Sequence, residues 1–246
     1  MRTDQKVRAE GHAIPHARGR GPIALGDIHA AELERFSLGL PGLDAVLGGG
    51  MVKGGAVLLS GDPGCGKSTL LMQALSHVAD QPGSRALYVT GEENEEQIKD
   101  RSERLGGISP HILLFPERDV DTILEIVDNV RPTCLVVDSA QVLNALGVDG
   151  IAGGVTQIKH CTGLLVEQCK RLRTSLLLVC HVTKDGGLAG PKTLEHLVDA
   201  VLSLDRGGGE SRTLTCPDKN RFGATDVHAL FEMGEKGLRG IGETAR

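Results

Sequence analysis

The sequence predicts an α/β fold, with a mostly parallel central sheet flanked by helices and antiparallel strands at one edge. Between residues 56 and 180, short apolar runs bounded by turn residues alternate with longer segments of helical periodicity. This alternation is typical of parallel strands joined by helices that cover both faces of the sheet. After Val201 the pattern changes to strand, glycine-rich turn and strand, which indicates antiparallel hairpins added at an edge.

The individual elements follow from the same pattern, and a short helix in "GLDAVLGG" precedes them. Strands are expected at Ala56 to Ser60, Arg85 to Thr90, Ile112 to Phe115, Cys134 to Asp138 and Ser175 to Cys180. Helices are expected at Ser68 to Val78, Glu95 to Leu105, Val120 to Val130 and Ile158 to Arg173. Asn94 and Gln97 have the spacing of a capping box at the start of the second helix, and Gly106 has the position of a terminating glycine.

Three segments differ in composition and predict the domain organisation. Residues 1–24 are rich in Gly, Arg and His and lack periodicity, which indicates a flexible N-terminal arm. Residues 25–238 contain the whole alternating pattern and are expected to form one domain. Residues 239–246 follow the last strand pattern, and a loose C-terminal tail is expected there.

Composition excludes several classes of function. The chain has 27 Lys and Arg against 32 Asp and Glu, a net charge of -5, so any contact with DNA must come from a local basic patch. With four Phe, one Tyr and no Trp, an aromatic platform for stacked bases is not expected. The sequence has neither a long apolar run nor a secretory leader pattern, which predicts a cytoplasmic protein without a membrane span.

The six cysteines form no C-x-x-C pair, and several fall inside apolar runs. They are interpreted as buried small hydrophobic residues in a reducing cytosol. No zinc site is therefore expected.

The segment "GDPGCGKST" matches the phosphate-binding pattern G-x-x-x-x-G-K-[ST] between a predicted strand and a predicted helix. Its glycines let backbone N–H groups turn towards an anion, and the helix N-terminus adds partial positive charge. The lysine would reach the β and γ phosphates of a nucleotide, and the serine would ligate Mg²⁺. An ordinary strand-to-helix turn is the alternative. The residues expected to bind nucleotide are Gly61, Asp62, Pro63, Gly64, Cys65, Gly66, Lys67, Ser68 and Thr69.

Acidic residues follow two other predicted strands. Asp138 ends the run "CLVVD", and we interpret it with Ser68 as a metal-binding pair. Glu92 and Glu93 follow "LYVT" and are candidates for the carboxylate that orients water, with Glu92 preferred. The alternative is that both acids simply begin the next helix. His181 ends a further strand, where it either senses the γ-phosphate or is a buried structural histidine.

The segment "PDKNRFGATD" is expected to form the tip of a hairpin. In extended backbone Lys219 and Arg221 share one face while Asn220 points away. A solvated basic tip is the simplest interpretation of this pair within a single chain.

Several segments together resemble the ATPase core of the bacterial RadA (Sms) family. They include "LGLPGLDAVLGGGMVKGGAVLLSGDPGCGKSTLLMQ", "LYVTGEENEEQIKDRSERLG", "LVVDSAQ", "HVTKDGGLAGPKTLEHLVDAVL" and "KNRFGATD", and the resemblance runs from about Ile23 to Leu238. It implies a RecA-like P-loop NTPase fold, a homohexameric ring, ATP hydrolysis with Mg²⁺, and DNA held in a central channel. It also implies that Glu92 activates water, and that Lys219 with Arg221 completes a neighbouring subunit's site.

The sequence departs from the family in three respects. The family's four-cysteine zinc module and its domain similar to the Lon protease have no counterpart in this chain. Pro217 and Asp218 stand where family members have apolar strand residues, so the hairpin tip is expected to differ.

The segments after Asp138 and His181 are the expected DNA loops, as the family's ring implies. They offer Lys159, Lys184 and Lys192, with Arg171 and Arg173 nearby, for contact with phosphates of single-stranded DNA. Ordinary surface charge explains the same lysines equally well. Two other functions are weighed: an ATP-driven regulatory switch of the KaiC type without DNA, and a P-loop small-molecule kinase, for which no arginine-rich lid is evident.

Overall fold

The computed structural model describes residues 33–181 and 190–245, with side chains as far as residue 242. The arm predicted at residues 1–24 and the candidate Lys184 lie outside the described residues. The description below concerns the unit that begins at Leu33.

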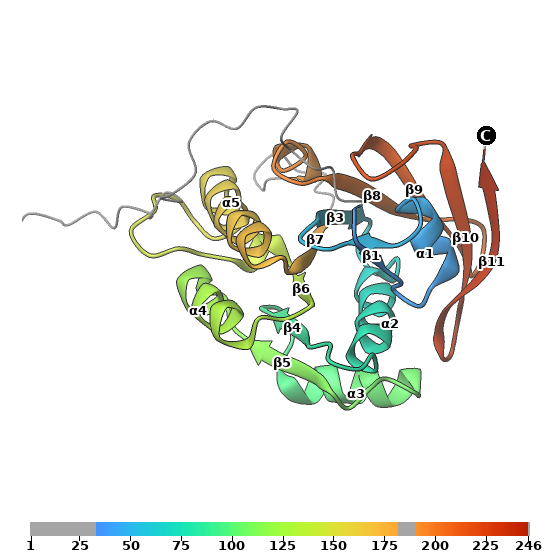
Figure 1. Ribbon diagram of the computed structural model, residues 1–246, viewed down its shortest axis with the longest axis horizontal. Helices are drawn as coiled ribbons and strands as arrows, with labels where there is room; N and C mark the ends of the chain where they lie inside the picture. Colours follow the sequence, from blue (N-terminus) through green and yellow to red (C-terminus); the bar gives the residue numbers. More distant parts are fainter. Residues whose placement is uncertain (1–32, 182–189, 246) are drawn as a thin grey trace, which may run out of the picture. The chain divides into compact units, whose positions relative to one another are not determined.

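Nine strands of the described segments form one mixed sheet (Figure 1), in the order β11-β10-β9-β8-β3-β7-β6-β4-β5. The six strands β8, β3, β7, β6, β4 and β5 run parallel, and β9, β10 and β11 extend the sheet as antiparallel strands. Their bounds are β3 Ala56–Gly61, β4 Ala86–Thr90, β5 Ile112–Pro116, β6 Cys134–Asp138, β7 Ser175–His181, β8 Ala200–Arg206, β9 Ser211–Asn220, β10 Val227–Gly234 and β11 Gly237–Ala245. A separate pair consists of β1 Arg35–Phe36 and β2 Met51–Val52.

Helices cover both faces of this sheet (Figure 1). Their bounds are α1 Pro41–Val46, α2 Lys67–Ala79, α3 Glu95–Leu105, α4 Val120–Val130 and α5 Val155–Leu172, with short 3-10 turns η2 Ala140–Val142 and η3 Pro191–Thr193. Helices α1, α2 and α3 share one buried apolar cluster, whereas α4 and α5 share the other. Successive residues of β3 divide between them, with Val57 facing the first cluster and Leu58 the second, as the alternation of side chains along a strand requires.

The predicted α/β class with antiparallel edge strands is confirmed. The structure gives β6, α3 and α4 the predicted bounds, and it extends β3, β5 and β7 by one residue each. The capping box is also present, because Asn94 Oδ1 accepts from the Gln97 backbone N–H at 2.9 Å while Gln97 Oε1 accepts from the Asn94 N–H at 3.0 Å. Gly106 ends α3 with φ 60°.

The prediction of a loose tail is corrected by the structure. Residues 237–245 form β11, which pairs with β10 from Val227 opposite Ala245 to Gly234 opposite Gly237. Leu238 is buried, and its backbone exchanges hydrogen bonds with the Gln73 side chain at 2.9 and 3.2 Å. The segment is therefore the outer strand of the sheet.

Candidate nucleotide-binding site

The predicted phosphate loop connects the end of β3 to the start of α2. At Gly61, φ is 146°, and a Cβ there would lie 2.3 Å from the backbone oxygen of Leu204. Only glycine fits this close approach of two strands. Lys67 is buried, and its ammonium group donates to the backbone oxygens of Gly61 at 2.8 Å and Asp62 at 2.9 Å. The loop and its lysine therefore lie at the carboxyl edge of the parallel strands.

The strand register brings the other candidates to the same edge. Gly61 of β3 is the Cα partner of His181 of β7, and Asp138 of β6 is the Cα partner of Thr90 of β4. Ligands of open parallel sheets bind at this edge. The four strand ends, which are far apart in sequence, thus face one common region.

Asp138 is a buried carboxylate with a single side-chain partner in the described residues. It is 6% exposed, and its Oδ2 accepts a hydrogen bond from the hydroxyl of Tyr88 at 2.7 Å. Burial, followed by the charge of Asp138, raises the pKa of Tyr88 well above its ordinary value. Tyr88 is therefore a neutral donor that holds Asp138 in place.

Glu92 lies beyond the end of β4 and contacts two neighbouring strand ends. Its Oε1 accepts from the Ser139 hydroxyl and lies 3.2 Å from Nε2 of His181. The hydrogen bond with His181 is the largest influence on the carboxyl group, and together with that from Ser139 it outweighs the effect of burial and lowers the pKa of Glu92 to about 2. The side chain remains 41% exposed. Glu92 is thus a fixed, ionised carboxylate with access to solvent.

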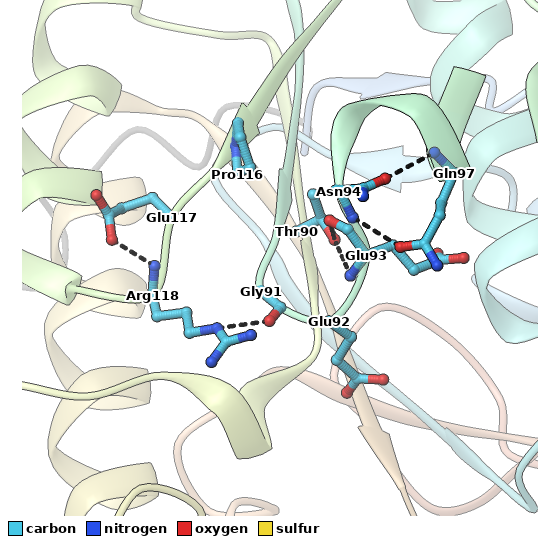
Figure 2. Close-up of a pocket in the computed structure, with 9 residues that line it drawn as sticks. All are labelled: Thr90, Gly91, Glu92, Glu93, Asn94, Gln97, Pro116, Glu117 and Arg118. Carbon is cyan, nitrogen blue, oxygen red and sulfur yellow. Dashed lines mark hydrogen bonds between the residues drawn. The ribbon is translucent and has the colours of Figure 1, made fainter. Parts of the chain in front are cut away.

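Glu93 has a different setting from its neighbour. Its carboxylate forms an ion pair with Arg101 of α3, and its backbone N–H donates to Thr90 Oγ1 at 3.2 Å. Figure 2 shows the two side chains directed apart, with Glu93 near the start of α3 and Glu92 away from it. This arrangement favours Glu92 over Glu93 as the acid that contacts a ligand.

A cavity of about 480 Å³ adjoins Glu92 (Figure 2). Arg118 closes part of it by donating from Nε to the backbone oxygen of Gly91 at 2.6 Å. The cavity is lined by Thr90, Gly91, Glu92, Glu93, Asn94, Gln97, Pro116, Glu117 and Arg118. It lies beside the candidate catalytic acid and is large enough for solvent to reach it.

Sequence reasoning missed Tyr88, Ser139 and Arg118. Ser139 follows the predicted metal-binding Asp138 directly, and Arg118 follows the end of β5 at the same sheet edge. Both were detectable as polar residues just beyond parallel strands. Tyr88 gave no such signal, because it lies inside an apolar run.

Lys219 and Arg221 lie at the amino-terminal ends of the parallel strands, whereas the phosphate loop lies at their carboxyl-terminal ends. Arg221 Nη1 is 3.2 Å from Oδ1 of the buried Asp199, whose Oδ2 accepts from the backbone N–H of Ala56 at 3.0 Å. Ala56 begins β3 and Gly61 ends it, so five residue steps of about 3.3 Å separate the two edges by roughly 17 Å. The structure therefore does not bring this pair to the phosphate loop of its own chain.

The basic pair is nonetheless ordered by neighbouring groups. Lys219 Nζ donates to the backbone oxygen of Glu195 at 2.9 Å, and burial with the nearby Arg221 charge lowers the pKa of Lys219. Lys170 of α5 shares Asp199 Oδ1 with Arg221, at 3.0 Å. Two cationic side chains thus contact one buried carboxylate, with Lys219 beside them.

The residues before the pair form an irregularity in β9. Ser203 of β8 pairs with Thr215 of β9, whereas Val201 pairs with Lys219. Two residues along β8 therefore correspond to four along β9. The extra length contains Pro217 and Asp218, both exposed. This bulge places Lys219 and Arg221 beyond the part of β9 that pairs with β10.

Two of the three candidate DNA-binding lysines, Lys159 and Lys192, lie in the described residues. Lys159 is exposed on α5 and Lys192 is exposed in η3, so both are accessible. The two nearby arginines are in surface ion pairs, Arg171 with Asp128 at 3.0 Å and Arg173 with Glu34 at 3.1 Å. The structure leaves Lys159 and Lys192 as the better candidates of the described residues.

The geometry can be compared with known proteins. The KaiC ATPase family matches residues 36–108, which include the phosphate loop and Glu92. DNA repair protein RadA of Mycobacterium tuberculosis is 42% identical over 231 residues, 93% of this chain and 48% of that protein. RadA of Escherichia coli is 43% identical over 218 residues, 88% of this chain and 47% of that protein. This confirms the resemblance to RadA. The chain spans about half the length of the RadA proteins that it matches.

A solved structure supports the fold assignment. The KaiC-like protein of Pyrococcus horikoshii has a TM-score of 0.69 and 22% identity, and the match covers 85% of this chain and all of that one. The fold is therefore the RecA-like ATPase fold of RadA and KaiC relatives. Across residues 33–181 and 190–245, no helix combines the length and apolar character needed to cross a membrane.

Proposed function

We propose that this protein is a RecA-like ATPase that works on DNA in recombination and repair. The observation that carries the proposal is the convergence of Lys67, Asp138 and Glu92 at one edge of the parallel strands. The 42% identity to a DNA repair protein over most of the chain supports the DNA assignment. Six free, buried cysteines agree with action in the reducing cytoplasm.

The residues present fit ATP and Mg²⁺. Ser68 lies in the first turn of α2, and Asp138 is a buried acid at the end of β6, on the same edge of the sheet as the phosphate loop. No group of three or more His, Cys, Asp or Glu in the described residues is placed to hold a metal. Mg²⁺ bound with nucleotide needs only one or two protein oxygens, because phosphates and water supply the rest. Ser68 and Asp138 would hold it, and it would neutralise charge on the phosphates.

Each site residue has a defined part in hydrolysis. The loop N–H groups and Lys67 bind the phosphates and stabilise the charge that develops as the γ-phosphoryl group transfers. Glu92 orients the attacking water and accepts its proton, since it is ionised and within reach of solvent. His181 fixes the Glu92 carboxylate and connects it to the segment that follows β7.

Lys219 and Arg221 act on a neighbouring subunit in this proposal. Their position at the edge opposite the phosphate loop rules out action within one rigid subunit, but a head-to-tail neighbour can present them to the γ-phosphate. A homohexameric ring of the kind that the resemblance to RadA implies would provide such neighbours. Arg221, whose side chain is 59% exposed, is the arginine finger, the residue that contacts the γ-phosphate bound by the neighbouring subunit. Lys219 assists it.

DNA, single-stranded in the first instance, would pass along the loops that follow β6 and β7. Phosphate contacts that do not depend on base sequence would come from Lys159, Lys192 and also Lys184, which lies outside the described residues. Hydrolysis at the subunit interfaces would drive translocation along the strand, as in branch migration.

A regulatory switch of the KaiC type, in which ATP drives assembly without DNA, is the second candidate. The match of residues 36–108 to the KaiC ATPase family and the net charge of -5 favour it. ATPase activity with and without single-stranded and duplex DNA, beside a mass measurement of the assembly, separates the two. Stimulation by DNA supports the first function, and DNA-independent activity in an assembled ring supports the second.

The proposed action of Lys219 and Arg221 on a neighbouring subunit, which we call the trans arrangement, has its own test. Lys67→Ala removes the phosphate lysine and Arg221→Ala removes the finger, so each protein alone should be inactive. Mixed assemblies contain some interfaces with both groups intact and should regain part of the ATPase activity. Absence of recovery in assemblies shown to be mixed would overturn the trans role. Activity of Lys67→Ala alone would overturn the phosphate-loop assignment.

A further inference from the structure

Two arginines face each other on neighbouring strands beside the phosphate loop. Arg206 at the end of β8 and Arg212 near the start of β9 are direct Cα partners in the antiparallel pair. Like charges directly opposite each other destabilise a sheet. Neither guanidinium group is within ion-pair distance of a carboxylate in the part of the chain that the structure describes. The pair therefore needs other partners.

Those partners are backbone oxygens, three of which belong to the phosphate loop. Arg206 Nη2 lies 2.8 Å from the oxygen of Gly64 and 3.3 Å from that of Pro63, and Arg212 Nε lies 2.9 Å from the oxygen of Cys65. Three successive carbonyl groups of the loop thus accept from two guanidinium groups. Arg212 Nη1 also donates to the oxygens of Ser211 at 2.7 Å and Gly209 at 3.3 Å in its own hairpin. Arg206 is exposed, whereas Arg212 is only 6% exposed.

Holding the carbonyl groups fixes the N–H groups as well. In a planar trans peptide, the oxygen of one residue and the N–H of the next point in opposite directions. The Pro63 and Cys65 oxygens held by the arginines therefore direct the N–H groups of Gly64 and Gly66 to the other side. These two N–H groups have no backbone or side-chain acceptor among the described residues, whereas the Cys65 N–H donates to Asp62 at 3.2 Å. Gly64 and Gly66 are thus two free donors of the loop.

We propose that Arg206 and Arg212 are positioning residues for nucleotide binding, which hold the phosphate loop from outside so that Gly64 and Gly66 donate to the phosphates. The inference rests on the proposed ATP site and adds the β8–β9 hairpin to it. Among the described residues no carboxylate pairs with either arginine, so their positive charge also favours a polyphosphate anion at the loop. The ligand class is a nucleoside di- or triphosphate.

Arg206 is the exposed residue of the pair, so its substitution is the better test because it disturbs the fold less. Arg206→Ala removes the donors to Gly64 and Pro63, and we expect the dissociation constant for ADP, measured by titration calorimetry, to rise about tenfold. Arg206→Lys keeps a charged donor and should recover most of the affinity. Arg239→Ala is the matched control, because Arg239 is an exposed arginine on nearby β11 that pairs with Glu232. Thermal unfolding of each variant checks that the fold is retained.

The outcomes distinguish this inference from the function on which it rests. If the wild-type protein does not bind ADP, the proposed ATP site itself fails. If the wild type binds ADP and Arg206→Ala binds it equally well, only the positioning role is overturned. Failure of Arg206→Lys to exceed Arg206→Ala in affinity would also contradict it. Arg212 donates to the oxygens of Cys65, Gly209 and Ser211 from two different nitrogens, an arrangement that lysine does not reproduce, so Arg212→Lys should show a loss at least as large as Arg206→Ala where it folds. Where it does not fold, the Arg206 variants decide the matter.

Discussion

The hydroxyl of Tyr88 donates to Oδ2 of Asp138 across 2.7 Å, from β4 to the neighbouring strand β6. Tyr88 is fully buried and is the single tyrosine of a chain that has no tryptophan. The same bond orders the candidate metal-binding acid and places a spectroscopic probe next to it. Tyrosine fluorescence of the wild-type protein therefore reports on the surroundings of Asp138.

Tyr88→Phe should destabilise the protein by leaving a buried carboxylate oxygen without its donor. The free energy of unfolding is expected to fall by about 1–3 kcal/mol, as measured by urea denaturation followed by circular dichroism. Thr162→Val is the control, because the Thr162 hydroxyl is buried without a hydrogen-bond partner in the described residues. An equal loss of unfolding free energy in both variants would show that the hydrogen bond from Tyr88 to Asp138 contributes no specific stabilisation.

Glu92→Gln should bind ATP but hydrolyse it about 10² to 10⁴ times more slowly, because the variant cannot accept a proton from water. Glu93→Gln breaks the ion pair with Arg101 and should reduce stability more than the hydrolysis rate. Single-turnover hydrolysis, with nucleotide binding measured separately, compares them. Our preference for Glu92 is wrong if Glu93→Gln is the slow variant.

The low pKa of Glu92 predicts a pH dependence of stability. The folded protein lowers this pKa from the ordinary value of 4.5 to about 2. A depressed carboxyl pKa stabilises the fold above the unfolded pKa, and this stabilisation is lost as pH falls from about 4.5 to about 2. The difference in unfolding free energy between wild type and Glu92→Gln should therefore be smaller at pH 3 than at pH 7.

A second glutamate provides the reference for this measurement. Glu125 is exposed on α4 and forms no ion pair within the described segments. The difference between wild type and Glu125→Gln should change little between the two pH values. A similar change for both glutamates would mean that the His181 and Ser139 hydrogen bonds do not lower the pKa of Glu92.

Replacing Lys159, Lys184 and Lys192 together with alanine should weaken DNA binding and make it less dependent on salt. Each lost phosphate contact reduces the slope of log K against log salt by about 0.7 for single strands. A matched triple variant at exposed lysines elsewhere, Lys53, Lys99 and Lys236, controls for the change in net charge. An unchanged slope in the first variant, or an equal change in the second, would place the DNA elsewhere.

The parallel part of the fold was predictable because each element is bounded by local signals. The run "CLVVD" ends at a charged residue, and α3 carries its own capping box, so β6 and α3 have the predicted bounds. The outer strand β11 was missed because glycines at 237, 240 and 242 interrupt its pattern. Backbone pairing with β10, which no local signal reveals, holds that strand.

The site was predictable where a motif or a strand end marks it. The phosphate loop, Asp138, Glu92 and His181 were candidates from the sequence, and the structure brings them to one sheet edge. The supporting residues were not, because their partners are distant: Tyr88 is 50 residues from Asp138, and Arg212 is 147 residues from Cys65. Such contacts depend on the register of whole strands.

The placement of the phosphate loop and the basic pair at opposite edges of one sheet has a consequence for assembly. Under the proposed trans arrangement, the interface joins two unlike surfaces and is therefore heterologous, so it either closes on itself or continues as a filament. In an open chain of subunits, the phosphate loop of one terminal subunit lacks Arg221 from a neighbour, and Arg221 of the other terminal subunit faces no phosphate loop. Only closure gives every subunit a complete site, so the activity per subunit should rise as the circle closes.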